Sequence, residues 1–431
     1  MINHWFSDVH AFKRDPLGLI AEKGKKSKLA FEPLALGPLP VYLIVDPSEV
    51  KPIMKLSETI SDKGRLVKKL VGVVGNSTLT LSGAEHGKRR AVLHERLSRG
   101  IAETYVGEMA ATIRATCLQL AKEKNFHADV VGGSLALKLV CIALFGHRIL
   151  TSFDEALIID AVEALEADLQ NEMFRFLPRT PWRKFSDMRI RSKALKNMEY
   201  IIEKVTERAS SSSVLIALRE LGLSEREVRD EIITMIIAGY HTTGAAIAWL
   251  AQFLAQESGL TEKLREEYKS IGDDAGEICA DRLPSANVSL SFVKEVLRLY
   301  PSAWWTTREL KQDFEHAQCK FKKGTTFIVS PWLYHRDSKN FTQPDQFSIE
   351  RTYSGAAYLP FGAGPRACVG MGVAILELQL VALEFAAAFD LEVLDDLRNL
   401  RPKSGITLSA PSISIGVHIH DVDEKAVGKA A

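Results

Sequence analysis

Residues 358–374 read Y-L-P-F-G-A-G-P-R-A-C-V-G-M-G-V-A, and this stretch decides how the rest of the chain is interpreted. Four glycines and two prolines surround one cysteine, Cys368, and a long apolar run follows it. Glycine allows backbone conformations and close approaches that a side chain forbids. A cysteine at the start of a helix lies where the helix dipole and free N–H groups favour a thiolate. Such a thiolate could be a nucleophile or a metal ligand.

Three other interpretations of the segment stay open at this point. G-A-G-P-R-A matches the G-x-G-x-x-A dinucleotide fingerprint, but that fingerprint belongs after a strand in a β-α-β unit near the start of a sheet. Here only 63 residues follow Cys368. A Cys–His hydrolase has no second motif to support it. A structural cysteine in a glycine-rich turn would be favoured if the segment stood alone.

Composition narrows the class of protein. The chain has 431 residues, 46% hydrophobic and 25% charged, with a net charge of +1. These values exclude a disordered chain and give no support to nucleic-acid binding through bulk charge. Five cysteines without a C-x-x-C pair favour a reducing compartment. No signal peptide is evident, and the apolar run 232–254 is interrupted by Tyr-His-Thr-Thr. We therefore expect a cytoplasmic protein without a membrane anchor.

Apolar periodicity predicts a mainly α protein with small β regions, in the α+β class. No β-α-β alternation is present, which argues against an open parallel sheet. We expect one domain over 1–431, with 1–14 as an N-terminal extension and 421–431 as a loose tail. Strand patterns occupy 28–46, 306–331 and 391–420. Helices are predicted over 103–122, 129–145, 154–172, 190–208, 224–257, 288–300 and 371–388.

The cysteine segment is part of a longer pattern. F-G-x-G-x-R-x-C-x-G, followed by A-x-x-E at Ala374 and Glu377, resembles the haem-binding signature of the cytochromes P-450. The resemblance implies the P-450 fold, with a long central helix over the haem. It makes Cys368 the axial thiolate ligand of iron in haem b, iron protoporphyrin IX, where it favours O–O cleavage. Further cofactor contacts that it implies are Phe361, Gly362, Gly370, Ala238 and Gly239.

A second motif lies in K-E-V-L-R. Glu295 and Arg298 are at i and i+3, so they share one helical face and can pair. Taken alone, E-x-x-R could be an ordinary surface ion pair. Beside the cysteine segment it resembles the family's E-x-x-R pair, which locks the core with a downstream arginine. In Q-P-D-Q-F-S-I-E-R that arginine is Arg351.

Haem carries two propionates, which need cationic partners when partly buried. In G-A-E-H-G-K-R-R, His86 and Arg90 are at i and i+4, which resembles the family's H-x-x-x-R clamp. Arg366 and Arg308 occupy further propionate positions by the same resemblance. Each of these arginines taken singly could instead be a solvated surface residue.

Residues 236–247 read I-I-A-G-Y-H-T-T-G-A-A-I and predict a buried helix. They resemble the family's A-G-x-(Asp/Glu)-T-T pattern, in which Thr242 supplies the hydroxyl that directs protons during oxygen activation. His241 stands where the family has a carboxylate. Imidazole has an ordinary pKa near 6.5, so His241 could relay protons. It could equally be a hydrogen-bonded core histidine.

The family's substrate-facing positions are mostly apolar here, which predicts a terpenoid, a fatty acid or a polyketide as substrate. A haem domain accounts for the 431 residues, so electrons from NAD(P)H would arrive through a separate ferredoxin or flavodoxin and its reductase. Lys88, Arg89, Arg96 and Arg99 form either a docking patch or a solvated face. The predicted pocket residues are Ile237, Ala238, Ala303, Trp304, Ile406 and Thr407.

The leading functional hypothesis is a monomeric haem-thiolate monooxygenase of secondary metabolism, which inserts one atom of O2 into its substrate. Alternatives are a peroxide-driven peroxygenase and a haem-thiolate isomerase or dehydratase. A haem sensor or carrier is the non-enzyme alternative. Thr242 argues against that last class, since a sensor does not need proton delivery.

Overall fold

The structure is a computed structural model, and it describes residues 6–56, 58–173, 181–209, 212–353, 355–396 and 401–420. The predicted loose tail over 421–431 lies outside these residues. So do residues 1–5 of the expected N-terminal extension. The rest of that extension includes a short helix, α1 (Val9–Arg14).

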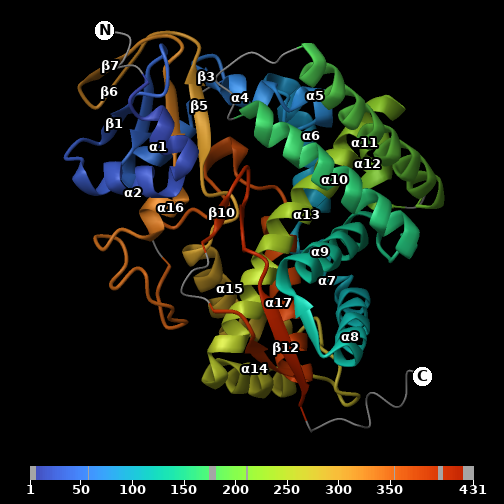
Figure 1. Cartoon of the computed structure of the whole chain (residues 1–431). Helices are drawn as coiled ribbons and strands as arrows, with labels where there is room; N and C mark the ends of the chain where they lie inside the picture. Colours follow the sequence, from blue (N-terminus) through green and yellow to red (C-terminus); the bar gives the residue numbers. More distant parts are fainter. Residues whose placement is uncertain are drawn as a thin grey trace.

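A sheet-rich part and a larger helical part make up the molecule (Figure 1). The sheet-rich part joins the N-terminal strands to strands from the last third of the chain, and the helical part surrounds α13. This architecture confirms the predicted α+β class. The helices after α1 are α2 (Pro16–Lys26), α3 (Val50–Met54), α4 (Gly64–Lys68), α5 (Val71–Val74), α6 (Gly83–Arg96), α7 (Arg99–Glu103), α8 (Val106–Glu123), α9 (Ala128–Phe145), α10 (Ser152–Met173), α11 (Pro181–Arg208), α12 (Ser213–Glu220), α13 (Glu225–Gln256), α14 (Ser258–Ile271), α15 (Asn287–Leu299), α16 (Pro331–His335) and α17 (Met371–Ala388).

The largest sheet has the strand order β1-β2-β8-β5-β3. Only β2 and β8 pair in parallel; the other neighbours in this sheet are antiparallel. A second sheet has the order β4-β12-β9, and two hairpin-like pairs are β6-β7 and β10-β11. The strands are β1 (Phe31–Leu34), β2 (Val41–Ile44), β3 (Ser61–Asp62), β4 (Asn125–His127), β5 (Thr306–Leu310), β6 (Phe314–His316), β7 (Cys319–Phe321), β8 (Thr326–Val329), β9 (Phe389–Val393), β10 (Lys403–Ser404), β11 (Leu408–Ser409) and β12 (Ser414–Ile419).

The predicted elements agree best with the structure where one apolar face is continuous. The helix predicted over 371–388 coincides with α17, and that over 224–257 matches α13 within one residue at each end. The helix predicted from 190 begins earlier, at Pro181. Four of its first nine residues are charged, so apolar spacing does not reveal them. The two strands expected around Gly324 are β7 and β8, but they pair with different neighbours.

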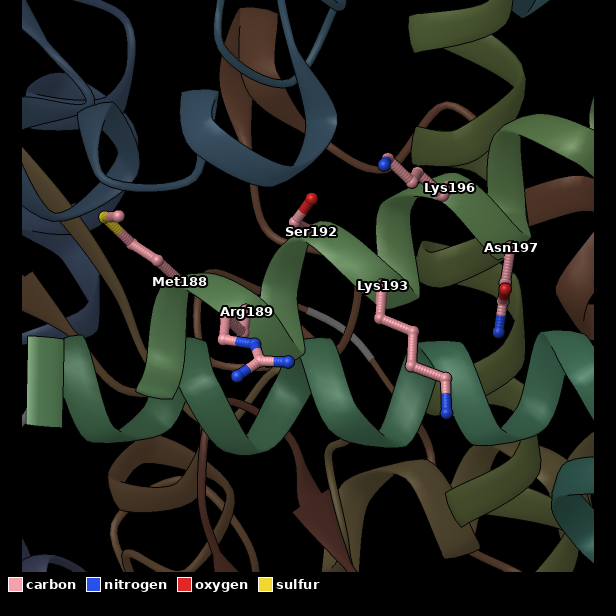
Figure 2. Close-up of a pocket in the computed structure, with 6 residues that line it drawn as sticks. All are labelled: Met188, Arg189, Ser192, Lys193, Lys196 and Asn197. Atoms are coloured by element: carbon pink, nitrogen blue, oxygen red, sulfur yellow. The ribbon is translucent and has the colours of Figure 1, made fainter. Parts of the chain in front are cut away.

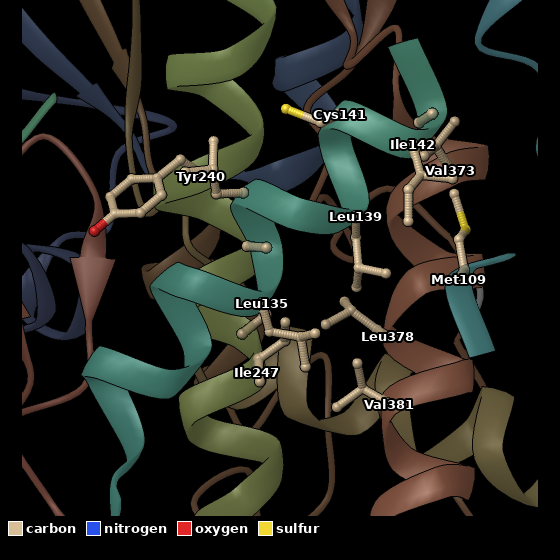
Figure 3. Close-up of a cluster of buried hydrophobic side chains, with 14 of the residues drawn as sticks. Met109, Leu135, Leu139, Cys141, Ile142, Tyr240, Ile247, Val373, Leu378 and Val381 are labelled. Carbon is tan, nitrogen blue, oxygen red and sulfur yellow. The ribbon is translucent and has the colours of Figure 1, made fainter. Parts of the chain in front are cut away.

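The helical core is built around α9, α13 and α17 (Figure 3). A Cβ atom on Gly132 of α9 would lie only 2.4 Å from the Gly244 carbonyl oxygen of α13. One on Gly239 would lie 2.6 Å from Val140. Glycine at these positions therefore lets α9 and α13 approach closely. A second apolar cluster lies under the large sheet and includes Trp304.

Three helices are long and apolar enough, by length and composition alone, to cross a membrane: α9, α13 and α17. Within their most apolar windows, 67% to 72% of the residues are buried inside the protein. Most of this apolar surface is therefore used in packing the core.

Candidate functional site

The segment before α17 folds into a tight loop that presents Cys368. Gly362 and Gly364 both have φ of +72°, a left-handed conformation that favours glycine. A Cβ atom on Gly364 would also lie 2.9 Å from the carbonyl oxygen of Met54. The backbone N–H of Cys368 donates to the Phe361 carbonyl at 2.9 Å, which closes the loop.

The Cys368 thiol is accessible to solvent although protein atoms surround it densely. Burial raises the pKa of Cys368 above its ordinary value, while the Gly370 N–H and the positive charge of Arg90 oppose this shift. The sequence predicted a thiolate because Cys368 precedes a helix, but the raised pKa means that the protein alone favours the neutral thiol. A metal cation bound to the sulfur would supply the missing stabilisation.

Halfway along α13, the helix also opens onto accessible space. Residues 231–236 and 243–254 are buried, whereas Ala238 is exposed and Ile237 and Thr242 are half-buried. The Thr242 hydroxyl donates to the Ala238 carbonyl at 2.7 Å, so it is held against its own helix. Ala238, the smallest of these side chains, leaves room for a flat ligand there. Gly239 does not share that role, because its missing side chain faces Val140 of α9.

The loop over 76–82 ties the cysteine segment to α13. The Thr78 backbone N–H and hydroxyl both donate to Glu231 of α13, at 2.7 and 3.0 Å. Arg366, two residues before the cysteine, donates to the Leu81 carbonyl at 2.7 Å and to that of Thr78 at 3.4 Å. One short loop therefore holds both functional segments.

Two more segments meet α13 at Thr242. The Ser302 hydroxyl donates to the Thr242 carbonyl at 2.8 Å, and the backbone N–H of Leu408 donates to the Ser302 carbonyl at 2.9 Å. These bonds bring Ala303, which is exposed, and the predicted pocket positions Ile406 and Thr407 to the same region. Ile406 is half-buried and Thr407 is 8% exposed.

Trp304 does not line this space, contrary to the expectation from the sequence. Its side chain is 0% exposed, and its indole N–H donates to the Gly405 carbonyl at 2.9 Å. The residue packs in the core beneath the large sheet. Ala303 is exposed while the next residue, Trp304, is buried, so these neighbouring side chains face different surroundings.

The predicted propionate partners do gather in one place. In addition to burial, the positive charges of Arg90, Arg308 and Arg366 lower the pKa of His86. In the same way, Arg366 lowers the pKa of Arg308, and Arg90 lowers that of Arg366. The same three arginines lower the pKa of Lys63. Burial, followed by the charges of its cationic neighbours, lowers the pKa of His86 to about 4. Burial and Arg366 lower the pKa of Arg308 to about 10. The cluster therefore contains more buried positive charge than its own carboxylates neutralise.

Lys63 belongs to this cluster, and sequence reasoning missed it. Burial and the charges of Arg366, Arg308 and Arg90 lower its pKa to about 7. Its ammonium donates to the Leu79 carbonyl at 2.8 Å. No signal in S-D-K-G-R distinguishes this lysine from its neighbours, because only the fold brings it to the other cations.

The cluster fits a dianionic group. Nη2 of Arg308 is buried and has no hydrogen-bond partner among the described residues, although its Nη1 donates to the Thr307 carbonyl. Arg366 binds Glu58 at 2.5 Å, and Glu58 lies 3.8 Å from His86. The cluster thus already binds the carboxylate of Glu58, and Nη2 of Arg308 remains without an acceptor in the described part of the chain. Two haem propionates would match this charge and donor set, with Cys368 available to the iron.

The E-x-x-R pair is buried and bidentate. Arg298 donates to the two carboxylate oxygens of Glu295 at 2.7 and 2.8 Å, and both side chains are 0% exposed. Arg351 donates to Glu295 at 3.0 Å and Tyr353 donates to it at 2.9 Å. The remaining donors of Arg298 reach carbonyls of His335 and Pro344. The structure thus brings the three expected residues together and satisfies their charges.

A family model described as "Cytochrome P450" matches residues 30–417. The chain belongs to the cytochromes P450. Cyclooctatin synthase of Streptomyces melanosporofaciens is 24% identical over 417 residues, which cover 92% of this chain and 90% of that protein. Pentalenene oxygenase of Streptomyces avermitilis is 25% identical over 401 residues, covering 88% and 87%.

Solved P450 structures share the fold. CYP175A1 from a strain of Thermus thermophilus superposes with a TM-score of 0.76 at 23% identity, covering 96% of this chain and 97% of that chain. The haem domain of cytochrome P450DA reaches a TM-score of 0.83 at 19% identity, covering 94% and 93%.

His241 of this P450 contacts a carboxylate on another helix. Its Nδ1 lies 3.1 Å from Oε2 of Glu166 on α10, and its Nε2 is buried without a hydrogen-bond partner among the described residues. Burial lowers the pKa of His241 to about 4. The ordinary value near 6.5, on which the sequence argument relied, therefore does not hold in the folded protein.

The basic residues around α6 do not form one uniform patch on the P450. Arg89 is 2% exposed and binds Glu85, Glu227 and Glu231, so it holds α6 against α13. Arg99 binds Glu103. Lys88 is exposed and Arg96 is half-buried, so the surface available to an acidic partner is smaller than the sequence suggested.

A hollow of about 500 Å³ lies on the surface of α11 (Figure 2). It contains none of the predicted site residues. The hollow is open to solvent, and we assign it no role in the P450 site. The lining residues are Met188, Arg189, Ser192, Lys193, Lys196 and Asn197.

Proposed function

We propose that this P450 is a monooxygenase that inserts one oxygen atom from O2 into a largely apolar small organic substrate of the terpenoid class. The observation that carries the proposal is the accessible stretch of α13 around Ala238 and Thr242. It leaves room for a flat cofactor, and a hydroxyl lies beside that room. A carrier or sensor does not need such a hydroxyl.

Haem b, when bound, supplies the iron at which O2 is activated, and Cys368 is its protein ligand. His86, Arg90, Arg308 and Arg366 bind the propionates, with Lys63 as a fifth partner. Phe361 shapes the loop that presents the sulfur, and the Gly370 N–H stabilises the thiolate.

Thr242 and His241 provide the proton path. The Thr242 hydroxyl donates its hydrogen to the Ala238 carbonyl. Its oxygen can therefore still accept a hydrogen bond from a group that supplies protons. His241, the preceding residue, brings a titratable group into the same turn of the helix. Correct delivery of protons separates productive oxygen insertion from release of peroxide.

The substrate class is supported by two arguments. Ile237, Ala238, Ala303 and Ile406 are small or apolar side chains with accessible surface, and apolar lining selects apolar ligands. Similar proteins are named pentalenene oxygenase and cyclooctat-9-en-7-ol 5-monooxygenase. A fatty acid or a polyketide would satisfy the lining alone, so the names favour a terpenoid.

Electrons come from a separate ferredoxin or flavodoxin with its reductase, and NAD(P)H acts only through them. Lys88 and Arg96 are the cations near α6 that would attract an acidic partner. The protein acts in the cytoplasm as a monomer.

A terpenoid library is first screened for compounds that shift the Soret band on binding. The compounds selected in this way are then tested in a turnover assay under ¹⁸O2. We expect one ¹⁸O atom in the product with ferredoxin, reductase and NADPH. Product formed only with hydrogen peroxide would assign a peroxygenase instead. A rearranged or dehydrated product without ¹⁸O would assign an isomerase or dehydratase.

A spectroscopic control establishes the iron ligand. The reduced protein with carbon monoxide should give a thiolate-type Soret band, and Cys368→Ser should lose it. Cys279→Ser is the matched control, because Cys279 is a half-buried free cysteine in the turn after α14, outside the cysteine segment. An unchanged band in Cys368→Ser would overturn the proposed ligand.

A further inference from the structure

An acid–imidazole pair joins α10 to α13 beside the proposed site. His241 Nδ1 and Glu166 Oε2 are 3.1 Å apart. The His241 side chain is 14% exposed, whereas that of Glu166 is 27% exposed. The carboxyl therefore has more contact with solvent than the imidazole does. The other ring nitrogen, Nε2, is buried without a hydrogen-bond partner among the described residues.

The surroundings of the pair are acidic. Glu163, one turn earlier on α10, lies 3.5 Å from the hydroxyl of Tyr240 and raises the pKa of Glu166. Asp129 of α9 adds negative charge near Tyr240. The Tyr240 ring meets the His241 ring edge-on, with 5.0 Å between the centroids. These are the titratable groups that face the pair from α9, α10 and α13.

Burial acts on the two partners in opposite directions. It lowers the pKa of His241 to about 4, because the imidazolium loses its hydration. It raises the pKa of Glu166, and the charge of Glu163 raises it further. Burial therefore removes the ordinary preference of a proton for the imidazole over the carboxylate.

We propose that Glu166 is a positioning residue that orients His241 and supplies it with protons, so that α10 and α13 together form the proton entry to Thr242. The proposal rests on the monooxygenase function above. The carboxyl Oε2 gives its proton to Nδ1, and the imidazole releases a different proton from Nε2. The carboxylate then takes up a proton from solvent. The imidazole, which now carries its proton on Nδ1, returns to the first tautomer by losing that proton to water and taking one up at Nε2. No electron moves in this exchange.

A merely structural pair is the alternative, in which Glu166 only holds α10 against α13. The two roles differ in what a neutral replacement does. Glu166→Gln keeps the size and a hydrogen-bonding oxygen, but it cannot give up an acidic proton. Glu166→Asp keeps the acid at a shorter reach. Asp160→Asn is the matched control, since Asp160 is an exposed carboxylate on the same helix.

The first measurement is the yield of product and of hydrogen peroxide per NADPH, as a function of pH. Partners that orient a functional imidazole typically contribute about 10- to 100-fold. We expect Glu166→Gln to lower the coupled rate by about that factor and to raise the peroxide yield. Glu166→Asp should recover part of the rate, and Asp160→Asn should match the parent. Substrate affinity, from the Soret shift, should be unchanged in all three variants.

The second measurement does not depend on turnover. Histidine labelled with ¹³C and ¹⁵N, in the diamagnetic reduced carbon monoxide complex, reports the titration of His241, assigned by its loss in His241→Gln. We expect the titration and tautomer signals of His241 to change in Glu166→Gln and to stay unchanged in Asp160→Asn. An unchanged His241 titration in Glu166→Gln would overturn the pairing.

The results separate this proposal from the function on which it rests. Parental coupling and pH dependence in Glu166→Gln overturn the proton supply, whatever the substrate is. Weaker substrate binding or lower thermal stability with parental coupling assigns the structural role. If the parent itself forms no oxygenated product, the monooxygenase function fails, and so does the proton supply to oxygen. The NMR titration then still decides whether the two groups share a proton.

Discussion

Glu377 of α17 and Thr243 of α13 meet across the core, with 3.5 Å between the threonine Oγ1 and the carboxyl Oε2. Both side chains are buried, and Oε1 of Glu377 has no hydrogen-bond partner among the described residues. Burial raises the pKa of Glu377 to about 8, against a smaller opposing effect of Thr243. A neutral carboxyl therefore links the helix that follows Cys368 to the helix that carries Thr242.

This pKa predicts a pH dependence of stability. The unfolded carboxyl ionises near 4.5, whereas the folded one ionises near 8. Between these values the unfolded state holds fewer protons, so the free energy of unfolding falls as pH rises and levels off above pH 8. Glu377→Gln cannot ionise, so it should gain stability relative to the parent between about pH 5 and 8, by at most about 5 kcal/mol.

Denaturant midpoints of the parent and Glu377→Gln at about pH 5 and about pH 8 measure this gain. Glu266→Gln, at an exposed position on α14, is the control and should show no such change. A parent-to-variant difference that is equal at both pH values would contradict a raised pKa for Glu377.

The buried Glu295–Arg298 pair predicts a strong effect on stability and on haem content. Removing Glu295 leaves the buried Arg298 without a carboxylate, and removing Arg298 leaves Glu295 with Arg351 as its remaining cation. Loss of one partner of a buried pair typically costs about 3–5 kcal/mol. Glu295→Ala and Arg298→Ala should therefore yield little folded, haem-loaded protein, measured by the ratio of Soret to protein absorbance. Glu315→Ala breaks an exposed pair with Lys320 and should cost about 0–1 kcal/mol. Normal haem content in both buried variants would refute the locking role.

The lowered pKa of Lys63 predicts proton uptake on haem binding. At about pH 8 the lysine is mostly neutral in the haem-free protein, since its pKa is about 7. A neighbouring propionate favours the ammonium and raises this pKa. At about pH 8, haem binding should then add about one proton at Lys63, opposite in sign to the proton that the Cys368 thiol releases on becoming the iron ligand.

Calorimetry of haem binding in buffers with different ionisation enthalpies measures this uptake. Lys63→Met should take up about one proton fewer than the parent, whereas Lys55→Met, at an exposed position after α3, should match the parent. Equal uptake in the parent and Lys63→Met would show that Lys63 does not contact the propionates.

Proton delivery predicts linked defects at His241 and Thr242. General acid–base catalysis typically contributes about 100- to 10,000-fold. His241→Ala should slow product formation by an amount in this range and raise the peroxide yield, with substrate affinity nearly unchanged. His241→Glu restores the family's carboxylate and should recover part of the coupling. Thr242→Ala should also release peroxide.

The pH profile supplies a further check on His241. Its lowered pKa moves the titration below the ordinary range of imidazole, so the coupled rate of the parent should not follow a free histidine near about pH 6.5. Normal coupling in His241→Ala would make it a structural core residue. If Thr242→Ala also left the rate of product formation and the peroxide yield unchanged, ordered water or the substrate would have to carry the proton.

Features that depend on neighbours along the chain could be predicted without the fold. The bounds of α17, the pairing of Glu295 with Arg298 one turn later and the glycine loop before Cys368 follow from spacing within a few residues. Apolar periodicity and i, i+3 contacts are local properties of a helix, so they can be read without knowing the fold.

Which distant groups share an electrostatic environment could be read only from the folded protein. Lys63 joins cations that are far from it along the chain, and Glu166 meets His241 across 75 residues. Arg89 and Trp304 are buried although their sequence neighbours Lys88 and Ala303 are exposed. Burial and Coulomb interactions depend on distance through space, and packing sets that distance for residues on different helices and strands.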